Sequence, residues 1–316
     1  MTGARTGLRW LTACLVVCAL ACEREEPPAL REFDAARAFS DLADQVAIGP
    51  RPMGSPAAEQ TRGLIKTRLR QAGWPTREVP FTAVGPQGEA INGINLIATL
   101  EKNSRRRIWL GAHYDTKAIP GVRFVGANDA ASGVALLLEL ARLLPSRSPE
   151  VTYELVFFDG EEALGRNISQ RDGLYGSRAL ARSLAETGEL AQIAAFLLVD
   201  MVADRDLNLT PDRGSASWLQ QALQQAADRI DPGLIDRTAS LFLVDDHTPF
   251  RDAGLKDVLA VIDLQFGART TPGPSWHTEA DHLESVSAES LNRVGRLVVE
   301  TLDTVERKVL AASGDF

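Results

Sequence analysis

Short runs of consecutive apolar residues alternate along the chain with longer segments whose apolar positions recur every three or four residues. The short runs are typical of strands buried on both faces, and the longer segments are typical of helices with one buried face. The runs lie at residues 108–112, 151–158, 194–199 and 258–262. The helical segments lie at residues 29–47, 130–144, 174–186, 216–229 and 288–310. This order predicts an α/β fold with a largely parallel sheet covered by helices on both faces.

The early part of the chain departs from this alternation. Ser55-Pro56 is a typical helix start and Gly73 a typical stop, so we expect a further helix between them. Residues 77–83 and 91–100 are strand-like and flank Gly85-Pro86-Gln87-Gly88. That arrangement predicts a β-hairpin.

The amino terminus reads as a bacterial export signal. An apolar run at residues 10–21 follows two arginines and is too short for a permanent transmembrane helix. It ends in Ala19-Leu20-Ala21-Cys22, which resembles a lipoprotein signal with Cys22 as the lipidated residue, although Leu is usual where Ala19 stands. Ordinary signal cleavage is the alternative. We expect residues 1–22 to be this leader and residues 23–316 to form a single domain, periplasmic or anchored to a membrane.

Composition narrows the class of protein. All three cysteines, Cys14, Cys18 and Cys22, lie in the leader, so the mature chain has no internal disulfide and depends on its core. The formal net charge is −8, and a cleaved leader takes no acidic residue with it. This charge argues against nucleic acid or anionic lipid as a partner. We expect a monomer that meets a membrane only through a lipid anchor.

Acidic residues and histidines cluster where predicted strands end, or in the loops that follow. Carboxylates beside apolar strands are unfavourable unless a positive charge compensates them, and a divalent cation does so most directly. The clusters are His113-Tyr114-Asp115, Asn128-Asp129, Asp159-Gly160-Glu161-Glu162, Asp200 and Trp276-His277. In parallel sheets ligands bind beyond the carboxyl ends of the strands, where these clusters fall. The pattern therefore predicts a zinc enzyme.

Three residues supply a catalytic zinc site. Zinc accepts His nitrogen and carboxylate oxygen, and a catalytic site uses three protein ligands with one open position. Asp129, Glu162 and His277 are that set. Neighbouring side chains on an extended segment point in opposite directions, so we assign Glu162 to the metal and Glu161 to proton transfer.

Each residue also has a structural interpretation when taken alone. Glu161-Glu162 resembles the acidic start of a helix, Asp129 an N-cap, and Asp200 a hydrogen-bonded carboxylate at a strand end. A metal site explains all of them together, because independent segments place acids at the same end of the sheet.

The remaining candidates are weaker. We interpret His247 and His282 as structural or capping residues. Asp245, two residues before His247, is kept as a candidate site residue. Trp276 would place an indole beside the metal and is assigned to substrate binding, with a core tryptophan as the alternative.

Six stretches resemble one known family. They are Gly111-Ala112-His113-Tyr114-Asp115, Gly126-Ala127-Asn128-Asp129, Phe157-Phe158-Asp159-Gly160-Glu161-Glu162-Ala163, Leu174-Tyr175-Gly176-Ser177-Arg178, Asp245-Asp246-His247-Thr248-Pro249-Phe250 and Trp276-His277-Thr278. They look like those of the glutaminyl-peptide cyclotransferases, the animal-type zinc glutaminyl cyclases, which share a fold with the M28 zinc aminopeptidases. The resemblance implies a three-layer α/β/α fold with a mixed, mainly parallel central sheet.

The resemblance also implies roles for the site residues. One zinc ion per chain would be bound by Asp129, Glu162 and His277. Glu161 would be the proton shuttle, Asp200 and Asp245 would support it through hydrogen bonds, and Trp276 would help to hold the substrate. The implied reaction is an acyl transfer that cyclises the N-terminal glutamine of a peptide to pyroglutamate and releases ammonia.

Two rivals to this function stay open. The first is an M28-type di-zinc aminopeptidase, in which His113, Asp129 and Asp200 hold a second metal and Glu161 activates water. The second is a binding protein with a degenerate peptidase fold.

The chain departs from the family pattern at two aromatic positions. Animal members carry a tryptophan where this chain has Gly165-Arg166-Asn167, and a phenylalanine where it has Thr271-Pro272. Two aromatic walls of the pocket are therefore expected to be missing.

Overall fold

A computed structural model of the chain describes residues 1–2, 32–238 and 240–313. All but the first two residues of the expected leader, including Cys22, lie outside the described residues. Within the described ranges, no helix combines the length and the apolar character needed to cross a membrane.

Six strands form one mixed sheet in the order β1-β2-β4-β3-β5-β6. The strands are β1 (Thr76–Val84), β2 (Ala90–Leu100), β3 (Arg107–His113), β4 (Thr152–Phe158), β5 (Ile193–Asp200) and β6 (Val258–Ile262). β2 runs antiparallel to β1 and β4, whereas β4, β3, β5 and β6 are mutually parallel neighbours. The predicted hairpin and the mainly parallel sheet are both confirmed.

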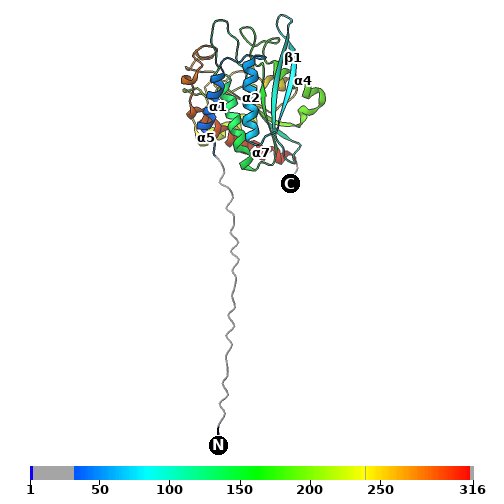
Figure 1. Ribbon diagram of the computed structural model, residues 1–316, viewed down its shortest axis with the longest axis vertical. Coiled ribbons are helices and arrows are strands. Elements are labelled where there is room, and N and C mark those ends of the chain that lie inside the picture. The colour runs from blue at the N-terminus through cyan, green and yellow to red at the C-terminus, as the bar shows by residue number, and fades with distance from the viewer. Residues whose placement is uncertain (3–31, 239, 314–316) are drawn as a thin grey trace. The chain divides into compact units, whose positions relative to one another are not determined.

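Helices cover both faces of this sheet (Figure 1). One face packs against α1 (Ala35–Ile48), α2 (Pro56–Gln71), α3 (Ala131–Leu143), α5 (Ser217–Ile230) and α7 (Ala288–Ser313). The other face packs against α4 (Tyr175–Thr187) and α6 (Thr248–Asp252). Strand β3 shows how alternation builds the two layers, because Ile108 and Leu110 enter the first core and Trp109 enters the second. The three-layer α/β/α expectation is confirmed.

Capping side chains set the starts of the first two helices. Ser55 Oγ accepts a hydrogen bond from Ala58 N–H, and Pro56 takes the first turn of α2, as the sequence predicted. The helix expected from residue 29 begins, within the described residues, only at Ala35. The Asp34 carboxylate accepts from Arg37 N–H and so fixes this later start.

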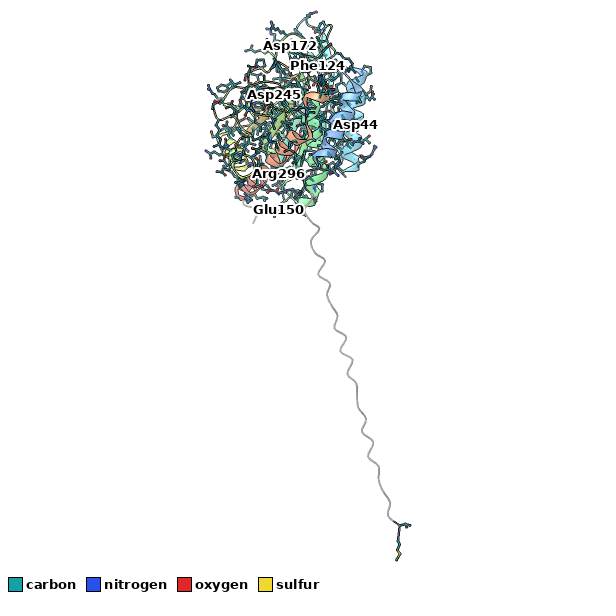
Figure 2. All side chains as sticks on the ribbon, turned by 90° about the vertical axis from the view of Figure 1, so that its left-hand side faces the viewer. Asp44, Phe124, Glu150, Asp172, Asp245 and Arg296 are labelled. Carbon is teal, nitrogen blue, oxygen red and sulfur yellow. The ribbon has the colours of Figure 1, made fainter. Side chains whose placement is uncertain are left out.

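The parallel strands all end at one edge of the sheet, and the loops that follow them gather there. Figure 2 places Phe124 and Asp172, which belong to these loops, toward one end of the folded unit, together with Asp245 from the segment between α5 and α6. Glu150, which lies just before β4 begins, is at the opposite end. The candidate site residues are therefore expected at this edge of the sheet.

Candidate metal centre and substrate pocket

Each parallel strand delivers predicted site residues to this edge. His113 is the last residue of β3 and Asp200 is the last residue of β5. Glu161 and Glu162 follow β4, and His277 lies in the loop after β6. Long-range contacts thus assemble a site from residues that are far apart in the sequence.

Asp129, Glu162 and His277 lie close enough to share a metal ion. His277 Nε2 lies 3.3 Å from Asp129 Oδ2 and 3.2 Å from Glu162 Oε1. Tetrahedral zinc with bonds of about 2.0–2.1 Å places its ligand atoms about 3.3 Å apart, so these separations fit. Glu162 Oε1 is also buried and accepts no hydrogen bond from the described residues, which leaves it available to a cation.

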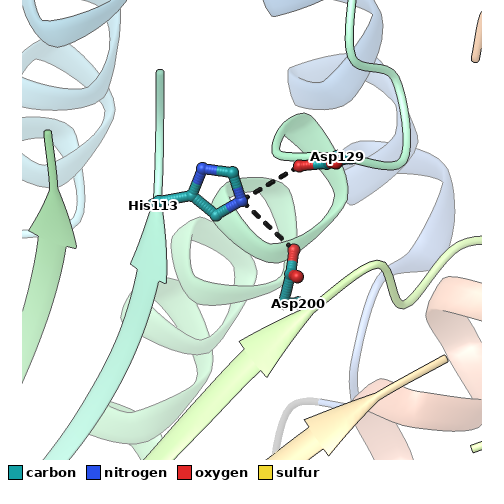
Figure 3. Close-up of side chains that lie close together, drawn as sticks. All are labelled: His113, Asp129 and Asp200. Atoms are coloured by element: carbon teal, nitrogen blue, oxygen red, sulfur yellow. Dashed lines mark hydrogen bonds and ion pairs between the residues drawn. The ribbon is translucent and has the colours of Figure 1, made fainter. Parts of the chain in front are cut away.

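A second group shares Asp129 with the first. His113 Nε2 lies 3.1 Å from Asp129 Oδ1 and 3.3 Å from Asp200 Oδ1 (Figure 3). All three side chains are buried or nearly so, and they also lie within the reach of one ion. Asp129 therefore presents one carboxylate oxygen to each of two overlapping ligand sets.

Buried groups that the sequence analysis missed hold the loop of Asp129 in place. The Asp281 carboxylate accepts hydrogen bonds from the backbone N–H groups of Asn128 (2.7 Å) and Asp129 (3.0 Å). The fully buried Arg51 guanidinium donates to the carbonyls of Val125 (2.6 Å) and Gly126 (3.0 Å). Asp129 is not an N-cap, because the cap of α3 is the next residue and makes no side-chain cap bond.

The Glu161-Glu162 segment is an irregular loop, so the interpretation as a helix start was wrong. Asp115 anchors it by accepting from Glu161 N–H at 3.1 Å and, less closely, from Glu162 N–H at 3.4 Å. Lys117, another residue that the sequence analysis missed, donates to the carbonyl of Ala163 at 2.7 Å. Lys117 Nζ also lies 3.5 Å from Glu162 Oε2, beside the oxygen that faces away from His277.

Aromatic rings fix the orientation of His277. The Trp276 ring stacks on the imidazole with ring centroids 3.9 Å apart, and Phe124 packs edge-on against it at 5.6 Å. The backbone of His277 has a φ of 56°, in the left-handed region that residues other than glycine rarely adopt. Such strain persists only where the surroundings enforce it, and it is frequent at functional sites.

One cavity of about 400 Å³ opens onto both ligand sets. Its acidic wall contains the five predicted carboxylates, Asp129, Glu161, Glu162, Asp200 and Asp245. Trp276 is only partly buried and lines the same cavity, which argues against a purely core role. A cavity of this size lies at the lower end of the range for small-molecule pockets.

The positions of the two missing aromatic residues do border this cavity. Arg166, Asn167, Thr271 and Pro272 line it, so polar or small side chains stand where the family resemblance implies aromatic ones. Apolar surface comes instead from the segment between Leu241 and Val244. Its Phe242 is 70% exposed and Val244 is 56% exposed, so both present apolar side chains to solvent at the mouth.

Burial and mutual repulsion disfavour the ionised form of most of these acids. Burial raises the pKa of Asp200 to about 7, against the favourable contact with His113. Burial also raises the pKa of Glu161, and the neighbouring carboxylate of Glu162 adds to the shift. Burial and Asp129 raise the pKa of Glu162 in the same direction. A bound divalent cation would offset this repulsion.

The two weaker histidines lie outside both ligand sets. His247 is fully buried, and its Nε2 lies 3.3 Å from Asp212 Oδ2. His282 caps a short 3₁₀ turn, since its Nδ1 accepts from Glu284 N–H. The capping interpretation of His282 is confirmed, and the structural interpretation of His247 stays a prediction.

Comparison with known proteins places this geometry in a family. The family model for peptidase family M28 matches residues 95–302. A glutaminyl-peptide cyclotransferase of Gloydius blomhoffii is 31% identical over 289 residues, which cover 78% of this chain and 74% of that protein. The Drosophila melanogaster protein of the same name is 29% identical, over 82% of this chain and 77% of its own length. The chain belongs to the glutaminyl-peptide cyclotransferases of peptidase family M28.

Solved structures of two glutaminyl cyclases agree with this placement. An Acidobacteriales bacterium glutaminyl cyclase superposes with a TM-score of 0.82 at 34% identity, covering 90% of this chain and 98% of that one. The Porphyromonas gingivalis glutaminyl cyclase gives a TM-score of 0.76 at 27% identity, covering 86% and 98%. A Bacteroides thetaiotaomicron leucine aminopeptidase precursor, at 23% identity and a TM-score of 0.75 over 86% and 97%, shares the fold.

Proposed function

We propose that this chain is a zinc-dependent glutaminyl cyclase, which converts the N-terminal glutamine of peptides to pyroglutamate and releases ammonia. One observation carries the proposal. The buried group of Asp129, Glu162 and His277 opens into the same cavity as Glu161, in a member of the cyclotransferase family.

We assign one zinc ion per chain to Asp129, Glu162 and His277. When bound there, zinc supplies Lewis-acid polarisation of the side-chain carbonyl of glutamine. Asp281, Asp115 and the stacked ring of Trp276 hold the ligand-bearing segments in position. Such outer contacts fix ligand orientation in metal sites generally.

Glu161 is the proton carrier in this proposal. It takes a proton from the α-amine as the amine nitrogen bonds to the side-chain carbonyl carbon of the same residue. It returns a proton to the amide nitrogen, which departs as ammonia when its bond to that carbon breaks. The raised pKa of the Glu161 carboxyl, caused first by burial, suits a group that must both accept and release a proton.

The other residues of the cavity position the reacting groups. Asp200 and Asp245 line the wall beside Glu161, and we assign them to supporting it through hydrogen bonds. Trp276 offers an apolar face and an indole N–H to the substrate. Because nucleophile and electrophile belong to one residue, the main task of the pocket is to hold glutamine in a ring-closing pose.

The second ligand set favours one alternative, a di-zinc aminopeptidase. In that function His113, Asp129 and Asp200 hold a second ion, and Glu161 activates a water molecule. Because both ligand sets are present, the reaction products have to distinguish the cyclase from the aminopeptidase.

The deciding experiment gives zinc-loaded protein a Gln-initiated, a Leu-initiated and an Ala-initiated peptide and follows the products by mass spectrometry. A cyclase removes ammonia from the Gln peptide and leaves the others intact. Release of free Leu or Ala would overturn the proposal in favour of the aminopeptidase. Elemental analysis of the same samples should give one zinc per chain, and the His113→Ala variant should keep it.

We also propose that residues 1–22 are a lipoprotein leader and that the single domain from residue 23 acts as a monomer outside the cytoplasm. The charge pattern of the leader and the Cys22 motif support this. Membrane fractionation of bacteria that express the wild type and the Cys22→Ser variant tests the anchor. Only the wild type should partition with the membrane, and analytical ultracentrifugation of the mature domain should give a monomer.

A further inference from the structure

A second cavity adjoins the substrate pocket on the α4 side of the sheet. It has a volume of about 640 Å³ and lies between α4, α6 and residues 168–170. We call it the α4–α6 groove. None of the catalytic or ligand assignments above uses it.

The groove and the substrate pocket meet at two residues. Ile168 and Val244 line both cavities, so the two cavities adjoin at these side chains. Val244 is 56% exposed and belongs to the apolar mouth of the pocket. The groove is therefore the neighbouring cavity on the side of the pocket where Val244 lies.

The wall between the two cavities is held in place without a ligand. The Arg178 guanidinium, on α4, donates to the carbonyls of Gln170 (2.8 Å) and Ser169 (2.5 Å). Asp172 accepts from the backbone N–H groups of Leu164 (2.7 Å) and Gly165 (2.8 Å) at the start of the same loop. A peptide that binds here therefore does not have to order the loop first.

The lining of the groove is balanced in charge. Arg178 and Arg182 face two acids, Glu186 and Asp252. Apolar side chains, including Ile168 and Pro249, provide much of the remaining surface. Such a lining can bind a peptide through the peptide's main chain and through apolar contacts. It should discriminate little between acidic, basic and neutral side chains of the peptide.

We propose that the α4–α6 groove binds the residues that follow the N-terminal residue of the substrate peptide. The inference rests on the proposed function, because it takes a peptide N-terminus to be held in the pocket beside Glu161. The pocket accommodates the first residue, and the groove receives the next few in extended form. The five residues that follow the first in a hexapeptide span up to about 17 Å, enough to reach along such a groove.

Kinetics with peptides of two lengths test the proposal. The kcat/KM for a neutral Gln hexapeptide should exceed that for Gln-Ala amide by about tenfold, equivalent to about 1.4 kcal/mol. Replacing neutral residues of the hexapeptide by Glu or by Lys should change kcat/KM by less than about threefold. Equal kcat/KM for the two lengths would overturn the proposal.

Variants that fill the groove test whether the higher kcat/KM of the hexapeptide depends on it. Ala185→Trp on α4 and Ala253→Trp on the opposite wall add a large side chain at exposed positions that line the groove. Each should abolish the advantage of the hexapeptide and leave the dipeptide rate unchanged. Ser183→Trp, exposed on α4 but outside the groove, is the matched control and should keep the advantage. An advantage that survives in both groove variants would contradict the proposal.

A binding measurement separates this inference from the proposed function. Calorimetry with zinc-loaded Glu161→Gln measures the Kd of both peptides without turnover, alone and combined with Ala185→Trp or Ser183→Trp. About tenfold tighter binding of the hexapeptide, lost only with Ala185→Trp, supports the groove even if the wild type cyclises no Gln substrate. Equal Kd values for both lengths reject the groove even if the wild type is an active cyclase.

Discussion

At the scale of single residues, Glu161 combines burial with several nearby acids. Only 8% of its surface is exposed, and the carboxylates of Glu162, Asp245 and Asp246 all disfavour its ionised form. Its backbone is fixed by Asp115, so the side chain can carry a proton without the loop moving. Glu161 is assigned to proton transfer. Glu162 is assigned to the metal instead, because its carboxylate oxygens lie beside His277 and Lys117.

Replacing Glu161 by glutamine should therefore abolish catalysis and preserve the metal. We expect kcat for a Gln peptide to fall by about 10²- to 10⁴-fold, because an amide cannot accept and return the proton. Elemental analysis should find the same zinc content as in the wild type. Glu162→Gln is the comparison, since it should lose zinc as well as activity. A Glu161→Gln enzyme within tenfold of the wild type would refute the assignment.

Asp281 acts on the metal site through the backbone. Its carboxylate satisfies two buried N–H groups, including that of Asp129, and thereby sets the position of the shared ligand. Asp281→Ala should weaken zinc binding by about 10- to 100-fold, the usual effect of losing an outer contact of a ligand. Competition with a chromogenic chelator gives the Kd. Glu284→Ala, a nearby exposed carboxylate, should leave the Kd unchanged, and an unchanged Kd in Asp281→Ala would disprove the role.

At the scale of elements, Asp212 joins two segments that flank the pocket. It accepts from Gly214 N–H in its own segment and from Leu243 N–H at the pocket mouth, and it lies 3.3 Å from His247. Burial opposes its ionisation, but His247 and the two N–H groups prevail and lower the pKa of Asp212 to about 2. His247, at the start of α6, and the mouth are therefore tied to the segment before α5 through one ionised carboxylate.

The contacts of Asp212 should make the free energy of unfolding depend on pH in the acid range. The pKa of Asp212 in the unfolded chain is about 3.9, so the ionised group stabilises the folded state above about pH 4. That stabilisation is lost as the pH falls toward 2. Asp212→Asn should thus be less stable than the wild type by about 2 kcal/mol at pH 6, and the difference should shrink as the pH is lowered to 3. Urea unfolding at each pH measures it. The exposed Asp228→Asn should show no such trend, and a constant difference for Asp212→Asn would be evidence against the link.

The elements also show where prediction from the sequence succeeds. Apolar runs and strand-end acids are local signals, so the strands and the grouping of Asp129, Glu162 and His277 could be expected before the structure was known. Arg51 and Asp281 could not. Both act on backbone groups of the loop before α3, and neither residue type nor spacing reveals such partners.

At the scale of the whole molecule, the site concentrates buried acids that the core alone does not stabilise. Binding of zinc to the folded state should therefore raise the free energy of unfolding, and tighter binding should raise it more. At a free zinc concentration of about 100 times Kd the gain is about 2.7 kcal/mol. Thermal unfolding of chelator-treated protein should show Tm rising by several degrees on addition of zinc. His277→Ala should show a much smaller rise at the same zinc concentration, and an equal rise would mean that the ion binds elsewhere.

The contact between Asp281 and the loop of Asp129 spans more than 150 residues of sequence, and it has a consequence for the order of events during synthesis. A ribosome that has not yet added residues 277–281 holds a chain without the proposed ligand His277 and without Asp281, which positions Asp129. A nascent or prematurely terminated chain therefore has no complete zinc site, however much of its sheet has formed. In the proposed enzyme, the zinc ion would therefore bind only after His277 and Asp281 have been synthesised.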